Sequence, residues 1–70
     1  MCEATAYGLT VDGEKTLMEM VVKMEINQEK IYLTNLLGET KTIIGKVEEI
    51  RLIDRKILIR ETQSNFKGKV

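Results

Sequence analysis

The chain has 70 residues, of which 43% are hydrophobic, and its eleven basic side chains balance its eleven acidic ones. A single domain of this length lies near the lower limit for a self-sufficient core, and one cysteine excludes an internal disulfide. We therefore expect a small fold of modest stability that gains buried surface by forming a homodimer.

The first expected strand runs from residue 2 to residue 11 and ends at a tight turn. Its apolar residues change phase near Gly8, which suggests a bulge or a bend in the strand. Asp12-Gly13 follows, and this dipeptide between two extended segments is a strong hairpin signal. The apolar residues before the change of phase are Cys2, Ala4 and Ala6, and those after it are Tyr7, Leu9 and Val11.

The segment of residues 15–26 allows two interpretations. Apolar residues in its first half recur at the spacing of a helical face, whereas apolar and charged residues alternate from Val22 to Ile26 as in a strand. We favour a short strand at Thr16–Met18, a connection, and a second strand at Val22–Ile26. A polar turn over Asn27–Lys30 and a strand over Ile31–Asn35 follow.

The second half of the chain continues with short β-branched segments separated by turn signals. Leu36 and Leu37 stand in a turn over residues 36–39, where we expect a partner or the end of a barrel to cover them. After this turn we expect strands at Thr40–Ile44, Val47–Leu52 and Ile57–Arg60, with a bend at Gly45, a kink at Glu48-Glu49 and a turn at Ile53–Lys56.

These segments predict an all-β fold of six or seven short strands. Strands at this spacing imply a small barrel or sandwich, and closure of the sheet protects its edges. We expect an SH3-like barrel that forms one domain over residues 1–60. Residues 61–70 are polar, and we expect them to form a frayed tail.

The residues offer little support for catalysis. A cysteine nucleophile needs a base, and the sequence has no histidine to serve beside Cys2. Glu48 and Glu49 are adjacent, so on a strand they point to opposite faces and do not converge on a substrate. The five glycines form no phosphate-binding fingerprint. We therefore expect a protein that is not an enzyme.

Cys2 is the strongest candidate for metal binding, because the start of the chain brings nitrogen donors beside its sulfur. With Met1 retained, the Met1 amine, the deprotonated Cys2 amide and the Cys2 thiolate can form fused chelate rings. With Met1 removed, Cys2 offers its amine and thiolate as one chelate, and two copies of this pair complete an S2N2 site in a homodimer. Planar nitrogen and sulfur donors of either kind suit Ni(II) or Cu(II). The alternative is that Cys2 is a small, half-buried hydrophobic residue. Zinc is less favoured, since no two ligands have the spacing typical of a zinc site.

The opening residues Met1-Cys2-Glu3-Ala4-Thr5-Ala6-Tyr7 also carry a family resemblance. Together with the Asp12-Gly13 turn, Val22–Ile26, the turn over residues 35–39 and the hairpin over residues 47–60, they resemble the CooT family over about residues 1–60. The family consists of nickel-binding accessory proteins linked to maturation of carbon monoxide dehydrogenase. The resemblance implies an SH3-like homodimer that binds Ni(II) through Cys2, with backbone nitrogens of Met1 and Cys2 as co-ligands. The leading hypothesis is thus a nickel metallochaperone.

Two other functions stay open at this point. A small barrel that binds RNA would use cations of the second half of the chain, although nearby acidic residues make a solvated surface the simpler interpretation. These cations are Lys41, Lys46, Arg51, Arg55, Lys56 and Arg60. An interaction module would instead use the Leu36-Leu37 turn.

The location in the cell is also an expectation at this stage. No apolar run approaches the roughly 20 residues of a membrane helix, and no signal peptide opens the chain. An unpaired thiol fits a reducing compartment. We therefore expect a soluble, cytoplasmic protein.

Overall fold

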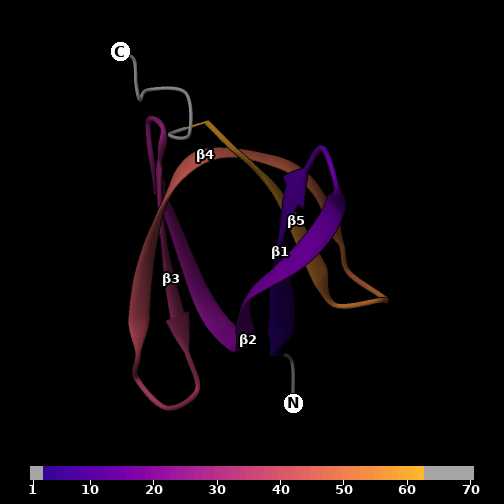
Figure 1. The fold of residues 1–70 in the computed structure, drawn as a ribbon. Helices are drawn as coiled ribbons and strands as arrows, with labels where there is room; N and C mark the ends of the chain where they lie inside the picture. The colour runs from indigo at the N-terminus through magenta and orange to yellow at the C-terminus, as the bar shows by residue number, and fades with distance from the viewer. Residues whose placement is uncertain (1–2, 63–70) are drawn as a thin grey trace.

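The structure, a computed structural model, describes residues 3–62 and contains five β-strands and no helix in that range (Figure 1). The predicted metal ligands Met1 and Cys2, and most of the predicted tail, lie outside the described residues. The strands are β1 (Ala4–Thr10), β2 (Gly13–Asn27), β3 (Lys30–Asn35), β4 (Thr40–Arg51) and β5 (Lys56–Glu61).

The five strands form a ring. Consecutive strands pair antiparallel, and a parallel pairing between β1 and β5 closes the sheet on itself. The all-β prediction is therefore confirmed, but the expected six or seven strands are five in the described part of the chain. Two long strands account for the difference, because each was interpreted from the sequence as two short ones. The SH3-like topology stays a prediction.

β2 is one continuous strand of 15 residues, so the predicted connection between Met18 and Val22 is wrong. From Ala4 to Ala6, β1 advances two residues while β2 advances three, from Val21 to Met18. Extra residues of this kind are β-bulges, and they bend the strand that carries them without ending it. The bulges thus lie on β2, opposite the part of β1 that precedes Gly8. The sequence had predicted a bulge or a bend in the first strand itself.

β4 is the second long strand, with 12 residues, and it changes partner halfway. It pairs with β3 up to Ile44 and with β5 from Gly45 onward. A β-carbon on Gly45 would collide with the Arg60 carbonyl, which explains why a glycine stands at this crossing. The register shifts once more between Val47 and Glu49, which confirms the kink expected around Glu48-Glu49.

The turns between the strands follow the sequence signals closely. At the Asp12-Gly13 turn, the Thr10 hydroxyl donates to the Gly13 carbonyl at 2.9 Å and accepts from the Asp12 amide at 3.1 Å. The Asn27–Lys30 turn is also confirmed, and Gln28 takes a positive φ of 59° there. The turn before β5 begins one residue earlier than expected, at Leu52.

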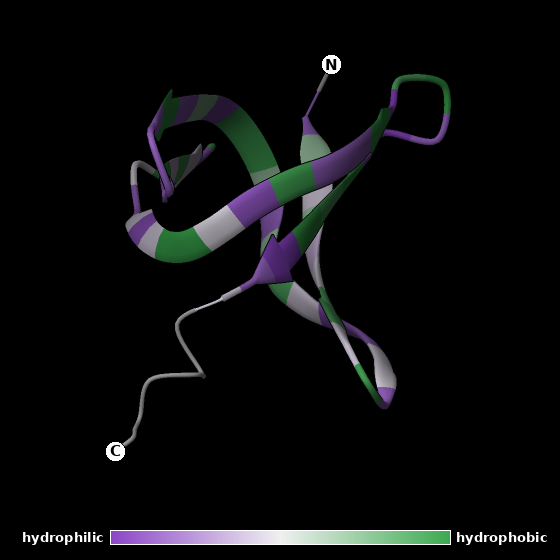
Figure 2. Ribbon diagram, turned by 90° about the horizontal axis from the view of Figure 1, so that it is seen from above, coloured by the Kyte–Doolittle hydropathy of each residue, from purple (hydrophilic) through white to green (hydrophobic). Residues whose placement is uncertain are grey.

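The core lies inside the ring and receives residues from every strand. Hydrophobic and hydrophilic residues alternate along much of the strands (Figure 2), which is the pattern of a sheet with one buried face. Ile31 and Leu33 point inward from β3 and are fully buried, as the alternation in that strand predicts. The packed cluster consists of Ala6, Leu17, Val21, Ile31, Leu33, Ile43, Ile57 and Ile59.

The last described residues extend the fold slightly past residue 60. β5 includes Glu61, and the Thr62 amide donates to the Ile44 carbonyl at 3.0 Å. The expected domain boundary and frayed tail stay predictions, because residues 63–70 lie outside the described part. Within residues 3–62 the structure contains no helix that is long and apolar enough to cross a membrane.

Candidate functional site

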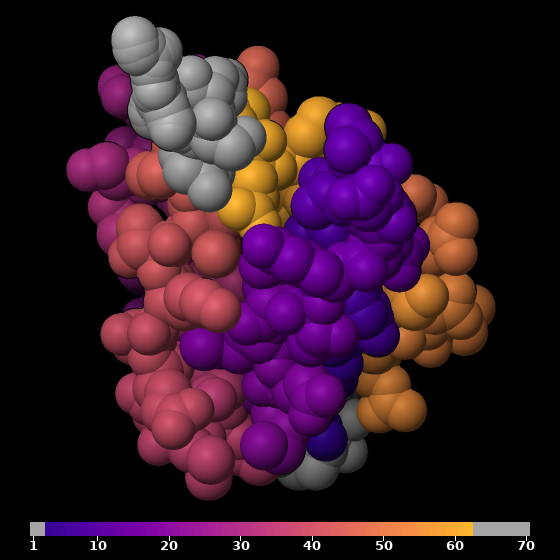
Figure 3. All heavy atoms as spheres, in the orientation of Figure 1, coloured from indigo at the N-terminus to yellow at the C-terminus, as the bar shows by residue number. Residues whose placement is uncertain are grey.

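The start of β1 is the part of the structure nearest to the predicted ligands Met1 and Cys2. β1 lies between β2 and β5, and in Figure 3 its indigo atoms are flanked by those of β2 and of the turn that precedes β5. Ala4 pairs with Val21 of β2, and the Thr5 amide donates to the Arg55 carbonyl at 2.9 Å. Cys2 precedes this anchored point by two residues in the sequence.

Glu3 is the first described residue, and its side chain is half-buried. Its Oε1 atom is buried and has no hydrogen-bond partner among residues 3–62. A buried carboxylate oxygen normally has a partner, because its desolvation is otherwise uncompensated. The only signal in the sequence that points to Glu3 is its position next to Cys2.

Metal-ligating side chains do not cluster in the described part of the chain. Residues 3–62 contain no group of three or more His, Cys, Asp or Glu side chains placed to hold one ion. Residues 3–62 thus offer no ready-made side-chain cluster beside Cys2. Amine, amide and thiolate donors form a set suited to a d⁸ or d⁹ ion.

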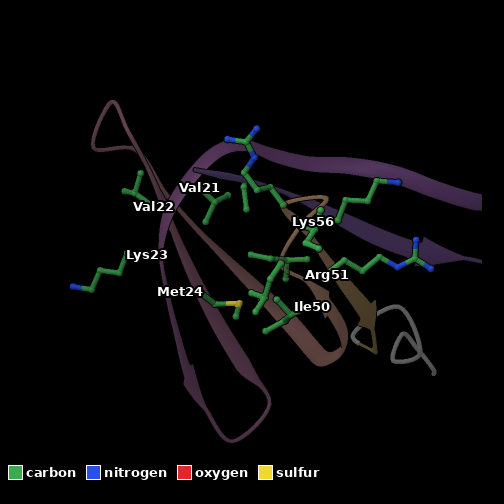
Figure 4. A pocket seen from close by; sticks show the side chains of 12 residues that line it. Val21, Val22, Lys23, Met24, Ile50, Arg51 and Lys56 are labelled. Atoms are coloured by element: carbon green, nitrogen blue, oxygen red, sulfur yellow. The ribbon is translucent and has the colours of Figure 1, made fainter. Parts of the chain in front are cut away.

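A groove of about 600 Å³ opens beside the start of β1. One wall comes from the middle of β2, and the other comes from the end of β4, the following turn and the start of β5 (Figure 4). Most of the lining is apolar, and much of it is exposed, with 82% exposure at Leu52 and 95% at Ile53. The lining residues are Ala4, Val21, Val22, Lys23, Met24, Ile50, Arg51, Leu52, Ile53, Arg55, Lys56 and Ile57.

The cations around this groove are Lys23, Arg51, Arg55 and Lys56. The Arg51 guanidinium lies 3.1 Å from Glu49 and 3.8 Å from Asp54, and the hydrogen bond to Glu49 is the main cause of its raised pKa. The Lys56 ammonium lies 5.2 Å from the centre of the Tyr7 ring, within the range of a cation–π contact. Lys23 lies 3.5 Å from Glu25.

The cations proposed for RNA binding do not form an unoccupied patch. Besides Arg51 and Lys56, the Lys41 ammonium donates to the Leu17 carbonyl at 3.0 Å. Arg60 donates to Glu48 at 2.6 Å. Glu48 and Glu49 thus pair with different arginines, so these two carboxylates do not form a shared site.

The Leu36-Leu37 turn is exposed in the single chain, so the end of the ring does not cover it, whereas cover by a partner stays a prediction. Leu36 is 50% exposed and Leu37 is 70% exposed in the single chain. The turn is nevertheless well held, because the buried Asn35 side chain accepts hydrogen bonds from the amides of Leu37 and Glu39. This turn lies between β3 and β4, outside the lining of the groove described above.

Comparisons with known proteins identify the family of the chain and a crystal structure with a similar fold. The sequence model of the CooT family, described as CO dehydrogenase accessory protein CooT, matches residues 1–60. A crystal structure described as CooT from Carboxydothermus hydrogenoformans is 33% identical, with a TM-score of 0.81. The alignment covers 87% of this chain and 98% of that one. No curated protein matches the sequence.

The family match begins at Met1 and includes Cys2. It covers β1 to β4 completely and β5 up to Arg60. The structural match is well above the level at which only a general fold is shared, and its sequence identity is high enough to support common descent. The family implies an accessory and non-catalytic role. The chain belongs to the CooT family of CO dehydrogenase accessory proteins.

Proposed function

We propose that this protein is a nickel metallochaperone that binds Ni(II) through Cys2 in a homodimer and serves maturation of a nickel enzyme such as carbon monoxide dehydrogenase. Membership of the CooT family carries the proposal, since the matched region begins at Met1 and includes the cysteine. Nickel is the cargo of the protein in this proposal. The dimer is part of the site, because one chain offers a single thiolate.

The chemistry of the chain terminus suits this cargo. The Cys2 thiolate and nearby backbone nitrogens are donors that a d⁸ ion accepts in a planar arrangement. With Met1 removed, each chain contributes one amine and one thiolate, and two chains complete four donors. With Met1 retained, the deprotonated Cys2 amide adds a further nitrogen. Both forms require deprotonated donors, so we expect nickel affinity to fall as the pH decreases.

Two structural observations support a site at this end of the molecule. The start of β1 is anchored on both sides, by Val21 of β2 and by the Arg55 carbonyl, so the terminal donors are attached to a defined point. Ala4 lines an apolar groove with exposed side chains, which is a surface suited to association. A site at a chain terminus also leaves the ion accessible for transfer to a client.

Titration of the purified protein with Ni(II), followed by thiolate-to-nickel charge-transfer absorption, tests the proposal. We expect about one nickel per two chains, and loss of the band in Cys2→Ser. Leu37→Ser is the control, because it changes an exposed residue that does not line the groove. Unchanged nickel binding by Cys2→Ser would refute the proposal.

Intact mass of the native protein, with and without nickel, completes the test. It reports whether Met1 is retained, how many ions are bound and whether the complex contains two chains. A native mass of one chain with one bound nickel would contradict the shared site. A mass of two chains without Met1 would show that each chain begins with Cys2, so that its amine is free to serve as a donor beside the thiolate.

A further inference from the structure

A second groove, with a volume of about 600 Å³, lies between the first half of β2 and the turn that joins β3 to β4. Residues 16–20 supply one wall, and Leu37, Glu39 and the start of β4 supply the other. Among the described residues, this groove and the groove beside Ala4 have no lining residue in common. The Leu36-Leu37 turn, which the proposed function does not use, therefore borders a separate surface of the molecule.

Three exposed apolar side chains stand close together on this surface. Leu37 lines the groove and is 70% exposed, while Leu36 and Met20 are 50% and 37% exposed. The Leu36 amide donates to the Met20 carbonyl at 2.8 Å, so the turn and β2 are in direct contact at this point. Methionine adapts its shape to different apolar partners, which suits a binding surface. We refer to Met20, Leu36 and Leu37 as the turn patch.

The turn patch is held in place by hydrogen bonds of the backbone. Asn35 Oδ1 accepts from the Leu37 amide at 3.0 Å, and the Gly38 amide donates to the Asn35 carbonyl at 3.0 Å. Gly38 has a φ of 87°, which glycine adopts without strain. A turn that is fixed in this way loses little conformational entropy when a partner binds to it.

The fold does not require leucine at either position of the turn. Leu36 and Leu37 form its hydrogen bonds through their backbone amides, which every residue except proline possesses. Polar residues would therefore support the same turn and would expose less apolar surface to water. Contiguous exposed apolar surface on a fixed loop is typical of a binding site.

Carboxylates flank the turn patch. Glu19 and Glu39 both line the groove, and both are exposed. Glu39 accepts from the Asn35 side chain through Oε1 at 2.8 Å, so its charge is held at the rim of the groove. Lys41, the cation of the described lining, donates to the Leu17 carbonyl at 3.0 Å and lies against β2. The rim beside the turn patch is therefore acidic.

We propose that the turn patch binds a segment of another protein that presents apolar side chains next to lysine or arginine. The apolar side chains of this segment cover the turn patch, and its cations lie beside Glu19 and Glu39. A two-fold contact between copies of this chain is disfavoured here, because it would bring the carboxylates of the two copies together. The proposal does not depend on nickel binding, since the turn patch shares no residue with the site proposed around Cys2.

Selection from a library of random short peptides displayed on phage tests the proposal. The full chain is the bait, and Leu37→Ser is used to remove the phage that bind elsewhere. The enriched peptides should combine leucine, isoleucine, methionine or phenylalanine with lysine or arginine. No enrichment relative to Leu37→Ser, or enriched peptides that lack a cation, would overturn the proposal.

Variants of the chain then locate the bound peptide. A synthetic copy of the most enriched peptide should bind Leu37→Ser and Glu19→Lys about tenfold more weakly each than the original chain, as measured by fluorescence anisotropy. Val11→Ser and Glu29→Lys are the matched controls, because they make corresponding changes at exposed positions outside this groove. Original affinity in both Leu37→Ser and Glu19→Lys would refute the assignment. Thermal unfolding of each variant checks that the fold is intact.

Two other occupants of the turn patch can be recognised with the same peptide and variants. Weaker self-association of Leu37→Ser than of the original chain, measured by sedimentation, would identify a second copy as the occupant. Deletion of residues 63–70, which include Phe66, Lys67 and Lys69, should leave the affinity for the peptide unchanged. A tenfold gain in affinity on this deletion would identify the end of the same chain as the occupant. Either result would overturn the proposal of a segment from another protein.

Discussion

Asn35 and Glu39 hold the turn between β3 and β4 together through both their backbones and their side chains. The Asn35 amide nitrogen Nδ2 donates to Glu39 Oε1 at 2.8 Å, and Asn35 Oδ1 accepts from the Glu39 backbone amide at 2.9 Å. The Asn35 backbone amide donates in turn to the Glu39 carbonyl at 3.0 Å. Asn35 is the buried polar residue of the described structure, and its partners account for its burial.

Asn35→Ala should therefore destabilise the protein by about 2–3 kcal/mol. It removes the Nδ2 donor and leaves the amides of Leu37 and Glu39 without the Oδ1 acceptor. Urea unfolding followed by circular dichroism measures the loss. Thr40→Ala serves as the comparison, because Thr40 is an exposed residue of the adjoining strand. Equal stability of Asn35→Ala and the original chain would contradict this role.

Asn35→Asp should show a pH dependence that Asn35→Ala lacks. The new carboxylate would lie beside Glu39 in place of the Nδ2 donor, and this like charge disfavours its ionised form in the folded state. The folded variant then binds more protons than the unfolded chain, so its deficit relative to the original protein shrinks as the pH falls from 7 toward 4. Unfolding curves at several pH values test this. A deficit that grows on acidification would contradict the prediction.

Gly45→Ala should be strongly destabilising, by about 2–4 kcal/mol. The added β-carbon would meet the Arg60 carbonyl and lie 2.9 Å from Glu61 Cα, and neither backbone atom can yield without shifting β5. Lys46→Ala, at the next position on the same strand, changes an exposed side chain and should stay within about 0.5 kcal/mol. Thermal unfolding of both variants measures the difference. Similar melting temperatures would show that the two strands separate easily at this crossing.

Leu33→Ala and Leu37→Ala should differ widely although the chemical change is the same. Leu33 is fully buried in the ring, so its truncation leaves a cavity and costs about 2–5 kcal/mol. Leu37 is 70% exposed, and its truncation should alter stability by less than about 0.5 kcal/mol. Equilibrium unfolding gives both values. A large loss in Leu37→Ala would indicate that the turn is covered in solution, as an interaction module would require.

RNA binding should be weak and should vary little with salt. True phosphate contacts release counterions, so their affinity falls steeply as salt increases. Lys41, Arg51 and Arg60 already engage acceptors of the protein itself, which leaves fewer cations for phosphate. Fluorescence anisotropy with a labelled single-stranded RNA measures the affinity. A series from about 25 to about 200 mM salt gives its dependence on salt. Tight binding at low salt with a steep loss would favour the RNA-binding alternative.

The sequence predicted the strands best where one feature decided the local structure. The Asp12-Gly13 turn and the alternation from Ile31 to Leu33 have a local cause, and both are confirmed. β2 was divided because its first half has apolar residues at the spacing of a helical face, whereas residues 22–26 alternate as in a strand. Such a change of pattern is ambiguous between a turn and a bulge. Which of these forms depends on the partner strands, because β2 exchanges β1 for β3 at Val21. That information is tertiary and does not appear in a short window of residues.

The candidate site was predicted only in part, for a different reason. The chemistry of Cys2 follows from residue types alone, since the sequence has one thiol and no histidine. The groove beside Ala4 could not be predicted, because its walls come from β2 and from the turn before β5, which are far apart in the sequence. The apolar residues Leu52 and Ile53 were interpreted as parts of a strand and a turn. Their common exposure is visible only in three dimensions.

The parallel pairing of β1 with β5 makes the start of the chain depend on its far end. Thr5 lies beside Lys56, and the Thr5 amide bonds to the Arg55 carbonyl, so the first strand gains its second neighbour only after the fifth has formed. Contacts between such distant segments form late and slowly during folding. A growing chain on the ribosome would therefore hold β1 against β2 alone until β5 has been synthesised.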